Sequence, residues 1–325
     1  MDPRTLFINE HGRPRSGWRL ILFVASFIAL FLLLSTGVRI GYVIVEATGL
    51  HIPYANFVAD VIYRMLLLTS ALGAGYLCCR FLEGLPWRSL GLTFHSRWFR
   101  DFFVGSIIGF LSLAMAVGIA ALAGGLRFTI SGSELVWAVI KSVGGSTVLF
   151  VVAALAEEAM FRGYGLQTLT RTKLVWLGIL LTSVPFAMGH FWNPNVVRGV
   201  TFINTTLAGV WLAIAYLRTR SLWLPLGVHW SWNWALGAFF GLPVSGLTLV
   251  SHPLLQGKDL GPAWITGGSY GIEGGAAGTI ALIVSSLFLW RTRLVSATPD
   301  LLKLTSEENP NAGESPKSTY QIFEA

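Results

Sequence analysis

The sequence is poor in charged residues. Of its 325 residues, 12% are charged and 54% are hydrophobic, whereas charged residues make up about 25% of a typical soluble protein. A fold of this composition could not cover its surface with groups that water solvates. Apolar stretches long enough to cross about 30 Å of hydrocarbon recur along most of the chain. The composition therefore argues against a soluble protein and predicts one that is embedded in a lipid bilayer.

Cysteines are nearly absent. The two that occur, Cys78 and Cys79, are adjacent, so they form neither a disulfide framework nor a CxxC metal site. A small-residue cleavage site is also lacking after the first apolar run, residues 20–34, which follows four arginines. We therefore expect this run to be a retained membrane helix and not a cleaved signal peptide.

Apolar windows predict an all-α polytopic membrane bundle with about eight transmembrane helices. The predicted spans are approximately residues 19–40, 58–80, 102–124, 136–161, 174–190, 198–217, 222–240 and 276–290. Two further segments are predicted to lie outside the helices. They are a Gly- and Pro-rich outer loop at about 242–275 and a disordered tail at 296–325.

Basic residues are distributed unevenly between the two sides that these helices define. The side of the N-terminus carries all but six of the 23 Lys and Arg residues, and the six are Arg39, Arg64, Arg127, Lys141, Arg198 and Lys258. This bias predicts that both termini are cytoplasmic. We expect the membrane to be a bacterial inner or cell membrane. Topology and anionic lipid then explain the net charge of +7, and no nucleic-acid partner is needed.

Two glutamates lie together inside the fourth apolar helix. Ionisable side chains at membrane depth are expensive and mark candidate functional sites. Glu157 and Glu158 are such residues, and Glu158 is spaced i, i+4 from Arg162, with which it can pair on one helix face. An alternative interpretation is structural. The pair would then only mark the cytoplasmic end of the helix, with Arg162 reaching the lipid headgroups.

Two histidines strengthen the functional interpretation. His190 ends the fifth apolar helix, and His229 lies in the seventh with Asn233 one turn later. A lone histidine in a membrane helix usually serves helix packing. Glutamates, histidines and an asparagine from three successive helices instead indicate one shared polar site, because polar residues in hydrocarbon seek one another.

These residues form three ordered motifs, Glu157-Glu158-x-x-x-Arg162, Phe186-x-x-x-His190 and His229-x-x-x-Asn233. The pattern resembles the CPBP family, which contains CAAX prenyl proteases and bacteriocin-processing enzymes, over roughly residues 139–241. The resemblance implies an intramembrane endopeptidase with a catalytic core at 136–241. The core would follow N-terminal helices at 1–135 and precede the outer loop and last helix at 242–295.

The resemblance also implies a role for each residue of the motifs. Glu157 would be the general base that activates water, with His190 holding or polarising that water. His229 and Asn233 would stabilise the oxyanion at the scissile carbonyl. Glu158, together with Arg162 and Phe186, would support these groups. The expected partners are the lipid bilayer and a membrane-embedded or prenylated-like peptide or protein.

A metal requirement stays open at this stage. Glu157, His190 and His229 could hold Zn²⁺ with water in a fourth position, but the spacing is not that of HExxH, and a metal-free mechanism fits equally well. Two other functions also stay open. One is a scaffold or immunity-type membrane protein without turnover, and the other is a proton-coupled transporter.

The predicted helix ends raise a geometric problem. A straight fifth helix beginning near Lys173 would place His190 about 25 Å from the cytoplasmic surface, but His229 only about 10 Å deep. The two histidines can meet only if the fifth helix begins deeper or tilts. We therefore expect residues 163–173 to form an amphipathic connector that dips into the membrane.

Overall fold

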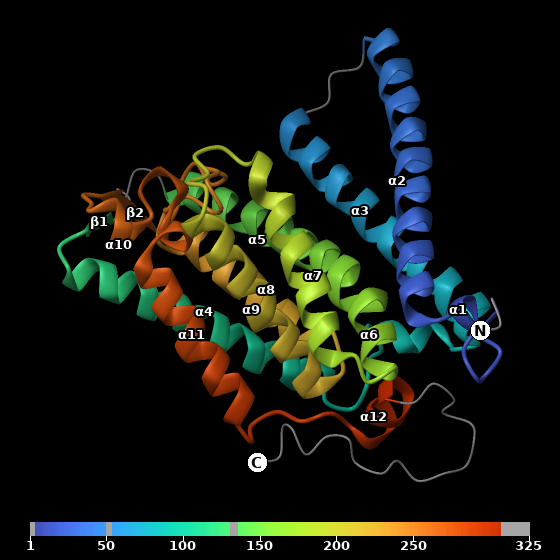
Figure 1. Ribbon diagram of the computed structural model, residues 1–325. Helices are drawn as coiled ribbons and strands as arrows, with labels where there is room; N and C mark the ends of the chain where they lie inside the picture. The colour runs from blue at the N-terminus through green and yellow to red at the C-terminus, as the bar shows by residue number, and fades with distance from the viewer. Residues whose placement is uncertain (1–3, 50–53, 131–135, 307–325) are drawn as a thin grey trace.

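The protein is a bundle of long helices, seen in a computed structural model that describes residues 4–49, 54–130 and 136–306 (Figure 1). All eight predicted spans contain a helix. These helices are α2 (Ser16–Ala47), α3 (Ala55–Cys78), α4 (Trp98–Leu122), α5 (Val136–Glu158), α7 (Val175–Gly189), α8 (Val200–Thr219), α9 (Trp223–Trp234) and α11 (Ala276–Arg291). The predicted all-α membrane bundle is confirmed.

Six of the helical segments in the described residues are long and apolar enough to cross a membrane. The two shorter ones are α9, which continues as a π-helix (Ala235–Phe239), and α11. Helix α9 lies between α4, α5 and α8, and most of its residues are buried. It is therefore surrounded by protein more than by lipid, and does not need the length of a lipid-exposed span.

Glycines allow α9 to pack against α4 at close range. A Cβ atom on Gly227 would lie 2.1 Å from the carbonyl oxygen of Phe102, and one on Gly105 would lie 2.3 Å from that of Leu224. Such separations are too short for any side chain, so the two backbones are in direct contact. Small residues permit this packing between membrane helices, and the contact fixes the helix that carries His229.

The fourth predicted helix does not end at residue 161. A π-helix (Ala159–Gly163) continues α5, and the short helix α6 (Tyr164–Arg171) follows it directly. Every residue of α6 is buried, so the connector predicted at 163–173 to dip into the membrane is a helix inside the bundle. Packing against α2 and α7 buries its polar side chains.

This continuation places Glu157 and His190 at the same level. Glu157 lies about 21 Å along the helix from Arg171, and His190 lies about 22 Å from the start of α7 at Val175. Because α6 and α7 are joined by a short turn, the two side chains reach the same level. The predicted end of the fourth helix was too early. His229 lies at the same level, because its Nε2 is 3.7 Å from Oε2 of Glu157.

A buried ion cluster ties three segments together at the end of the bundle that holds the N-terminus. Glu83 ends the π-helix Cys79–Glu83, which extends α3. Its carboxylate accepts from Arg19 of α2 at 2.8 Å and from Arg171 of α6 at 2.8 Å. All three side chains are at most 2% exposed. The cluster therefore sets α2, α3 and α6 in one register.

The region predicted as a loop at 242–275 contains short structured elements. Strand β2 (Leu255–Asp259) pairs antiparallel with β1 (Leu126–Ile130). Helix α10 (Ala263–Thr266) and 3-10 turns at Gly268–Tyr270 and Ile272–Gly274 lead into α11. The remaining short elements are α1 (Arg4–Phe7) and 3-10 turns at Trp87–Leu90 and His190–Trp192.

The tail predicted to be disordered from residue 296 is partly helical. Helix α12 (Pro299–Ser306) buries Leu301 and Thr305 and contacts α6. Burial of Leu301 and Thr305 orders a segment whose composition alone favours disorder. The rest of that predicted tail, 307–325, lies outside the described residues.

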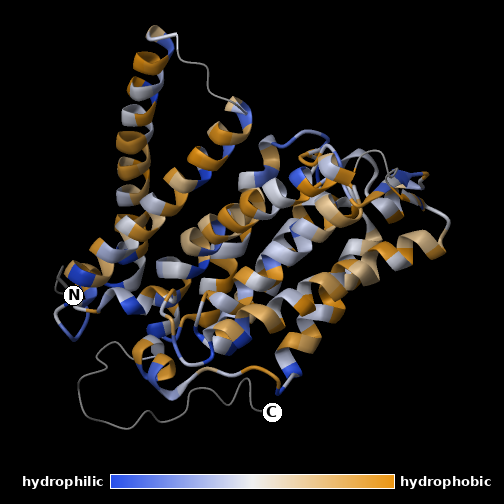
Figure 2. Cartoon of the chain, turned by 180° about the vertical axis from the view of Figure 1, so that it is seen from behind, coloured by the Kyte–Doolittle hydropathy of each residue, from blue (hydrophilic) through white to orange (hydrophobic). Residues whose placement is uncertain are grey.

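Apolar side chains cover the outside of the bundle, as expected in lipid. Figure 2 shows hydrophobic residues along α2 and α3, which diverge toward the end of the bundle away from α12. On α2, Leu32, Leu33 and Ile40 are each more than half exposed. Helices α1 and α12 lie at the same end of the bundle (Figure 1), as an even number of crossings requires.

Candidate active site

Four of the five predicted catalytic residues line one cavity of about 380 Å³. They are Glu157 at the end of α5, His190 after α7, and His229 and Asn233 of α9. The fifth, Glu158, is fully buried and lies behind His229. The structure thus brings three motifs from separate helices to one place.

His229 joins the two glutamates. Its Nδ1 lies 2.8 Å from Oε1 of Glu158, and its Nε2 lies 3.7 Å from Oε2 of Glu157. Neighbouring glutamates on a helix point in directions about 100° apart, so each meets a different ring nitrogen. The adjacent carboxylates therefore have different tasks. Glu158 fixes the ring, and Glu157 shares the cavity with it.

Arg162 holds Glu158 from the other side. Its Nη1 lies 3.2 Å from Oε1 of Glu158, and its Nη2 donates to the carbonyl oxygen of Gly209 at 2.9 Å. The guanidinium also lies 4.8 Å from the centroid of the Phe186 ring, a cation–π distance. Arg162 is fully buried. Arg162 and Glu158 thus form a buried support behind His229, which lines the cavity.

Phe186 separates the two histidine rings. Its ring centroid lies 4.9 Å from that of His190 and 6.0 Å from that of His229. Both imidazoles therefore contact one aromatic ring. His190 Nδ1 lies 2.8 Å from the carbonyl oxygen of Phe186. Since a carbonyl oxygen only accepts, Nδ1 carries the hydrogen, which leaves Nε2 of His190 to accept from another group.

The carboxylate of Glu157 is available for chemistry. Its Oε2 is enclosed and has no hydrogen-bond partner in the described part of the chain, while its side chain is 23% exposed. Oε2 of Glu157 lies 3.7 Å from Nε2 of His229, so a water molecule bound beside Oε2 also lies near the imidazole. Glu157 is the carboxylate of the site that is both reachable and unsatisfied.

The three residues predicted as possible zinc ligands line one cavity but do not form a metal-binding group among the described residues. The tautomer of His190 suits metal binding, since a ligating histidine commonly donates its other nitrogen to an oxygen. Within the described residues, however, no three His, Cys, Asp or Glu side chains form a group that could hold a metal ion. Glu157, His190 and His229 therefore do not make a ready ligand set in this arrangement.

The segment that carries these groups matches a known family. Residues 140–235 match the family described as type II CAAX prenyl endopeptidase Rce1-like. This segment is Rce1-like. The match confirms the resemblance to CAAX prenyl proteases that the three motifs predicted. No curated protein and no solved structure matches the chain.

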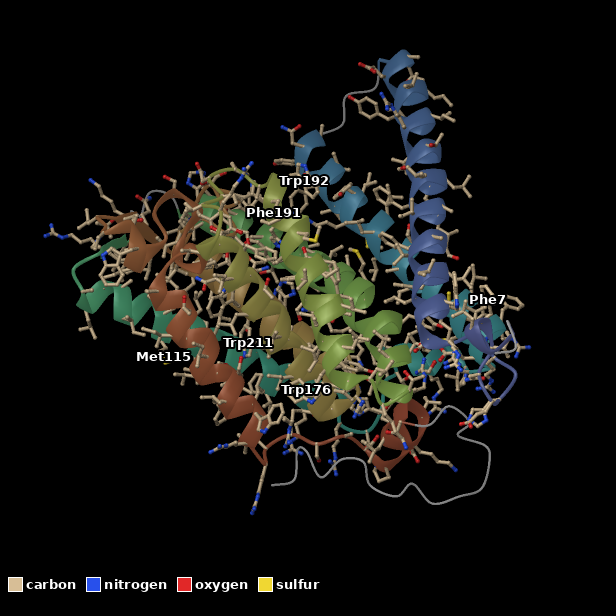
Figure 3. The ribbon with its side chains drawn as sticks, viewed as in Figure 1. Phe7, Met115, Trp176, Phe191, Trp192 and Trp211 are labelled. Carbon is tan, nitrogen blue, oxygen red and sulfur yellow. The ribbon has the colours of Figure 1, made fainter. Side chains whose placement is uncertain are left out.

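The Rce1-like segment spans α5 to α9 and includes all five predicted catalytic residues. The cavity extends beyond this segment. Its walls also contain Tyr63 and Arg64 of α3, and Glu273 of the loop before α11. Trp211 of α8 forms part of the wall inside the bundle, while Phe191 and Trp192 lie at the exposed end of α7 (Figure 3).

Sequence analysis missed Glu273, which the Rce1-like segment does not include. Its carboxylate accepts from the indole nitrogen of Trp232 at 3.0 Å, and from the backbone nitrogen and hydroxyl of Ser245 at 2.6 and 2.9 Å. It therefore ties the loop after α9 to the wall of the cavity. The residue stands among glycines, where no periodic pattern marks it.

Asn204 of α8 was also missed, although its polar amide in an apolar helix was a usable signal. It is 2% exposed and lines the cavity. Its amide nitrogen donates to the carbonyl oxygens of Glu273 and Gly275 at 2.9 and 3.1 Å, and its oxygen accepts from Thr279 at 2.7 Å. These bonds position the backbone around Glu273.

Proposed function

We propose that the protein hydrolyses a peptide bond near the C-terminus of a membrane-associated substrate, with Glu157 as the general base. The observation that carries this proposal is the unsatisfied Oε2 of Glu157 beside His229 in a cavity between apolar helices. The name of the matched family supports a CAAX-type substrate, in which a prenylated cysteine precedes three C-terminal residues.

In the first step, the Glu157 carboxylate takes a proton from a water molecule, and the water oxygen attacks the scissile carbonyl carbon. The carbonyl oxygen becomes an oxyanion, which the Asn233 amide and the Nε2 hydrogen of His229 stabilise. His190, whose Nε2 is free to accept, holds the second hydrogen of the water. In the second step the tetrahedral intermediate breaks its C–N bond, and the proton on Glu157 passes to the leaving amine.

A charge count supports a doubly protonated His229. The buried group holds two carboxylates, Glu157 and Glu158, and one guanidinium, Arg162. With a cationic imidazole the group is neutral overall, and a neutral group is the least expensive one to enclose in a low-dielectric interior. A cationic ring carries hydrogens on both nitrogens. It can therefore donate to Glu158 and to an oxyanion at the same time.

We also propose that both termini face the cytoplasm of a bacterial cell. The uneven distribution of Lys and Arg residues supports this orientation, and so does the position of α1 and α12 at one end of the bundle. A cytoplasmic reporter fused after Lys303 should be active. An active periplasmic reporter at that position would contradict the proposal.

The proposed activity is tested with a fluorescence-quenched peptide that carries a prenylated cysteine three residues before its C-terminus. Purified wild-type protein in lipid nanodiscs should cleave it. The Glu157→Gln protein should lose about 10² to 10⁴ in rate while it keeps the wild-type unfolding temperature, because the amide keeps the size but cannot take a proton. Glu46→Gln, the same change at an exposed position of α2, is the matched control.

A scaffold function makes the opposite prediction. If the protein acts without turnover, the Glu157→Gln chromosomal variant should restore every phenotype of a deletion strain. Full activity of the purified Glu157→Gln protein on a peptide that the wild type cleaves would end the assignment of this site.

A further inference from the structure

Arg64 is a cationic residue in the wall of the cavity that the proposed mechanism does not use. It is about the tenth residue of α3 and lies in an apolar helix that is long enough to span the membrane. It is also one of the six basic residues that do not follow the charge bias of the sequence. Basic residues inside membrane spans are expensive to keep and usually serve function.

Arg64 has no partner among the described residues. Its guanidinium forms no hydrogen bond or ion pair with residues 4–49, 54–130 or 136–306, and its Nε is enclosed without an acceptor. Neither Glu157 nor Glu273, the two carboxylates that line the same cavity, pairs with it. Arginine presents five N–H donors in a planar fork that fits a carboxylate through two parallel bonds. Arg64 thus brings a donor set of that geometry to the wall of the cavity.

The lipid surface is a poor alternative partner for this guanidinium. Arg64 lies about 14 Å along α3 from Ala55, beyond the reach of one arginine side chain. The side chain also borders the cavity. Its environment therefore points to a ligand inside the cavity and not to a phospholipid headgroup.

The level of Arg64 relative to Glu157 follows from the ion cluster. Glu83 and Arg171 are in contact at 2.8 Å, so they give a common origin for α3 and for the α5–α6 helix. From this origin, Glu157 lies about 21 Å along its helix and Arg64 about 28 Å along α3. The difference of about 7 Å equals roughly two residues of extended peptide.

We infer that Arg64 binds the free α-carboxylate of the substrate's C-terminal residue and so selects for cleavage within about one to three residues of that end. The inference rests on the proposed function for the site and adds a specificity-determining residue to it. Arg64 touches the substrate end, whereas Glu157 acts on the scissile bond. A peptide whose C-terminus is amidated lacks the charge that this pairing requires.

The test compares two peptides that differ only at the C-terminus, one a free acid and one an amide, each with the prenylated cysteine described above. The wild type should cleave the acid roughly ten- to hundredfold more efficiently in kcat/KM, the range for one charge-assisted hydrogen-bond pair. Arg64→Gln should lose this preference and cleave both peptides at the rate of the amide. Arg64→Lys should keep part of it, since an ammonium retains the charge but not the fork.

Arg39→Gln is the matched control, because Arg39 is an exposed arginine of α2 and its loss removes the same charge. This variant should discriminate between the acid and the amide as the wild type does. Equal cleavage of both peptides by the wild type would overturn the inference while leaving Glu157-dependent hydrolysis intact. So would a preference that Arg64→Gln retains, which would assign the discrimination to another residue.

A binding measurement separates this inference from the proposed activity. Glu157→Gln protein, which is expected to bind without turnover, should hold the acid roughly tenfold or more tightly than the amide, and Glu157→Gln/Arg64→Gln should hold both alike. If this difference is present but the wild type cleaves neither peptide, the carboxylate site stands and the peptidase assignment fails. If no difference in binding is found, the carboxylate site is refuted.

Discussion

His229 and Glu158 form a 2.8 Å bond between α9 and α5, in which the imidazole Nδ1 donates and the carboxylate accepts. Both side chains are nearly or fully buried. The bond fixes the ring so that its other nitrogen faces Glu157 across 3.7 Å. It also means that the glutamate beside the proposed general base acts through the histidine and does not contact the cavity.

Glu158→Gln should destabilise the protein and lower its rate of peptide hydrolysis. The change leaves the Arg162 guanidinium without its carboxylate partner in a fully buried position, and breaking such a pair typically destabilises a protein by about 3–5 kcal/mol. Thermal unfolding in detergent micelles should show a clearly lower midpoint than wild type, whereas Glu46→Gln should not. A wild-type midpoint for Glu158→Gln would show that the buried chain does not support the fold.

Asn233→Ala should lower kcat by about 10² to 10³ with little change in KM, the usual effect of losing one oxyanion donor. The amide hydrogen bond matters mainly after the oxyanion has formed, so substrate binding is expected to persist. Steady-state kinetics on the quenched peptide measures both constants. Asn56→Ala, at an exposed position of α3, is the control. A rise in KM at constant kcat would instead assign Asn233 to substrate binding.

Hydrolysis should persist after exhaustive dialysis against a metal chelator. The reason is geometric, since Glu157, His190 and His229 do not converge as a ligand set among the described residues. Metal content by mass spectrometry and activity are measured on the same sample. Loss of activity that added Zn²⁺ restores, together with metal release in His190→Ala and His229→Ala, would refute this prediction.

Glu273→Ala should loosen the loop that follows α9. The substitution leaves the donors of Trp232 and Ser245 without their acceptor, and an unsatisfied buried donor typically costs about 1–3 kcal/mol. Hydrogen exchange of residues 243–249 should become faster, and peptide hydrolysis slower. Glu273→Gln keeps an acceptor oxygen and should show a smaller effect. Unchanged exchange in Glu273→Ala would mean that other contacts hold the loop.

Much of the helical frame could be predicted from composition and apolar windows, because lipid imposes a strong pattern on each span. The ends of the spans were harder to predict. Helix α6 is polar in sequence and buried in structure, and only its packing against α2 and α7 explains this. Sequence alone carries no information about such a neighbour, which is why the fourth helix was ended too early.

The grouping of Glu157, His190, His229 and Asn233 could be predicted, because polar residues in apolar membrane helices face the interior of the bundle and pair with one another. The contribution of Glu273 could not, because it lies in a Gly-rich loop about 40 residues beyond α9. Arg64 was visible only as an exception to the charge bias. Its position in the cavity depends on the register that the Arg19–Glu83–Arg171 cluster sets.

The walls of the cavity come from residues as far apart as Tyr63 and Leu282, and this spread has a consequence for biosynthesis. A nascent chain that has been translated as far as Asn233 contains every proposed catalytic residue, but not Glu273 or the loop that Glu273 anchors. The enclosed chamber exists only once the ribosome has delivered α11. The proposed hydrolytic capacity would therefore be acquired late in translation, after most of the chain has entered the bilayer.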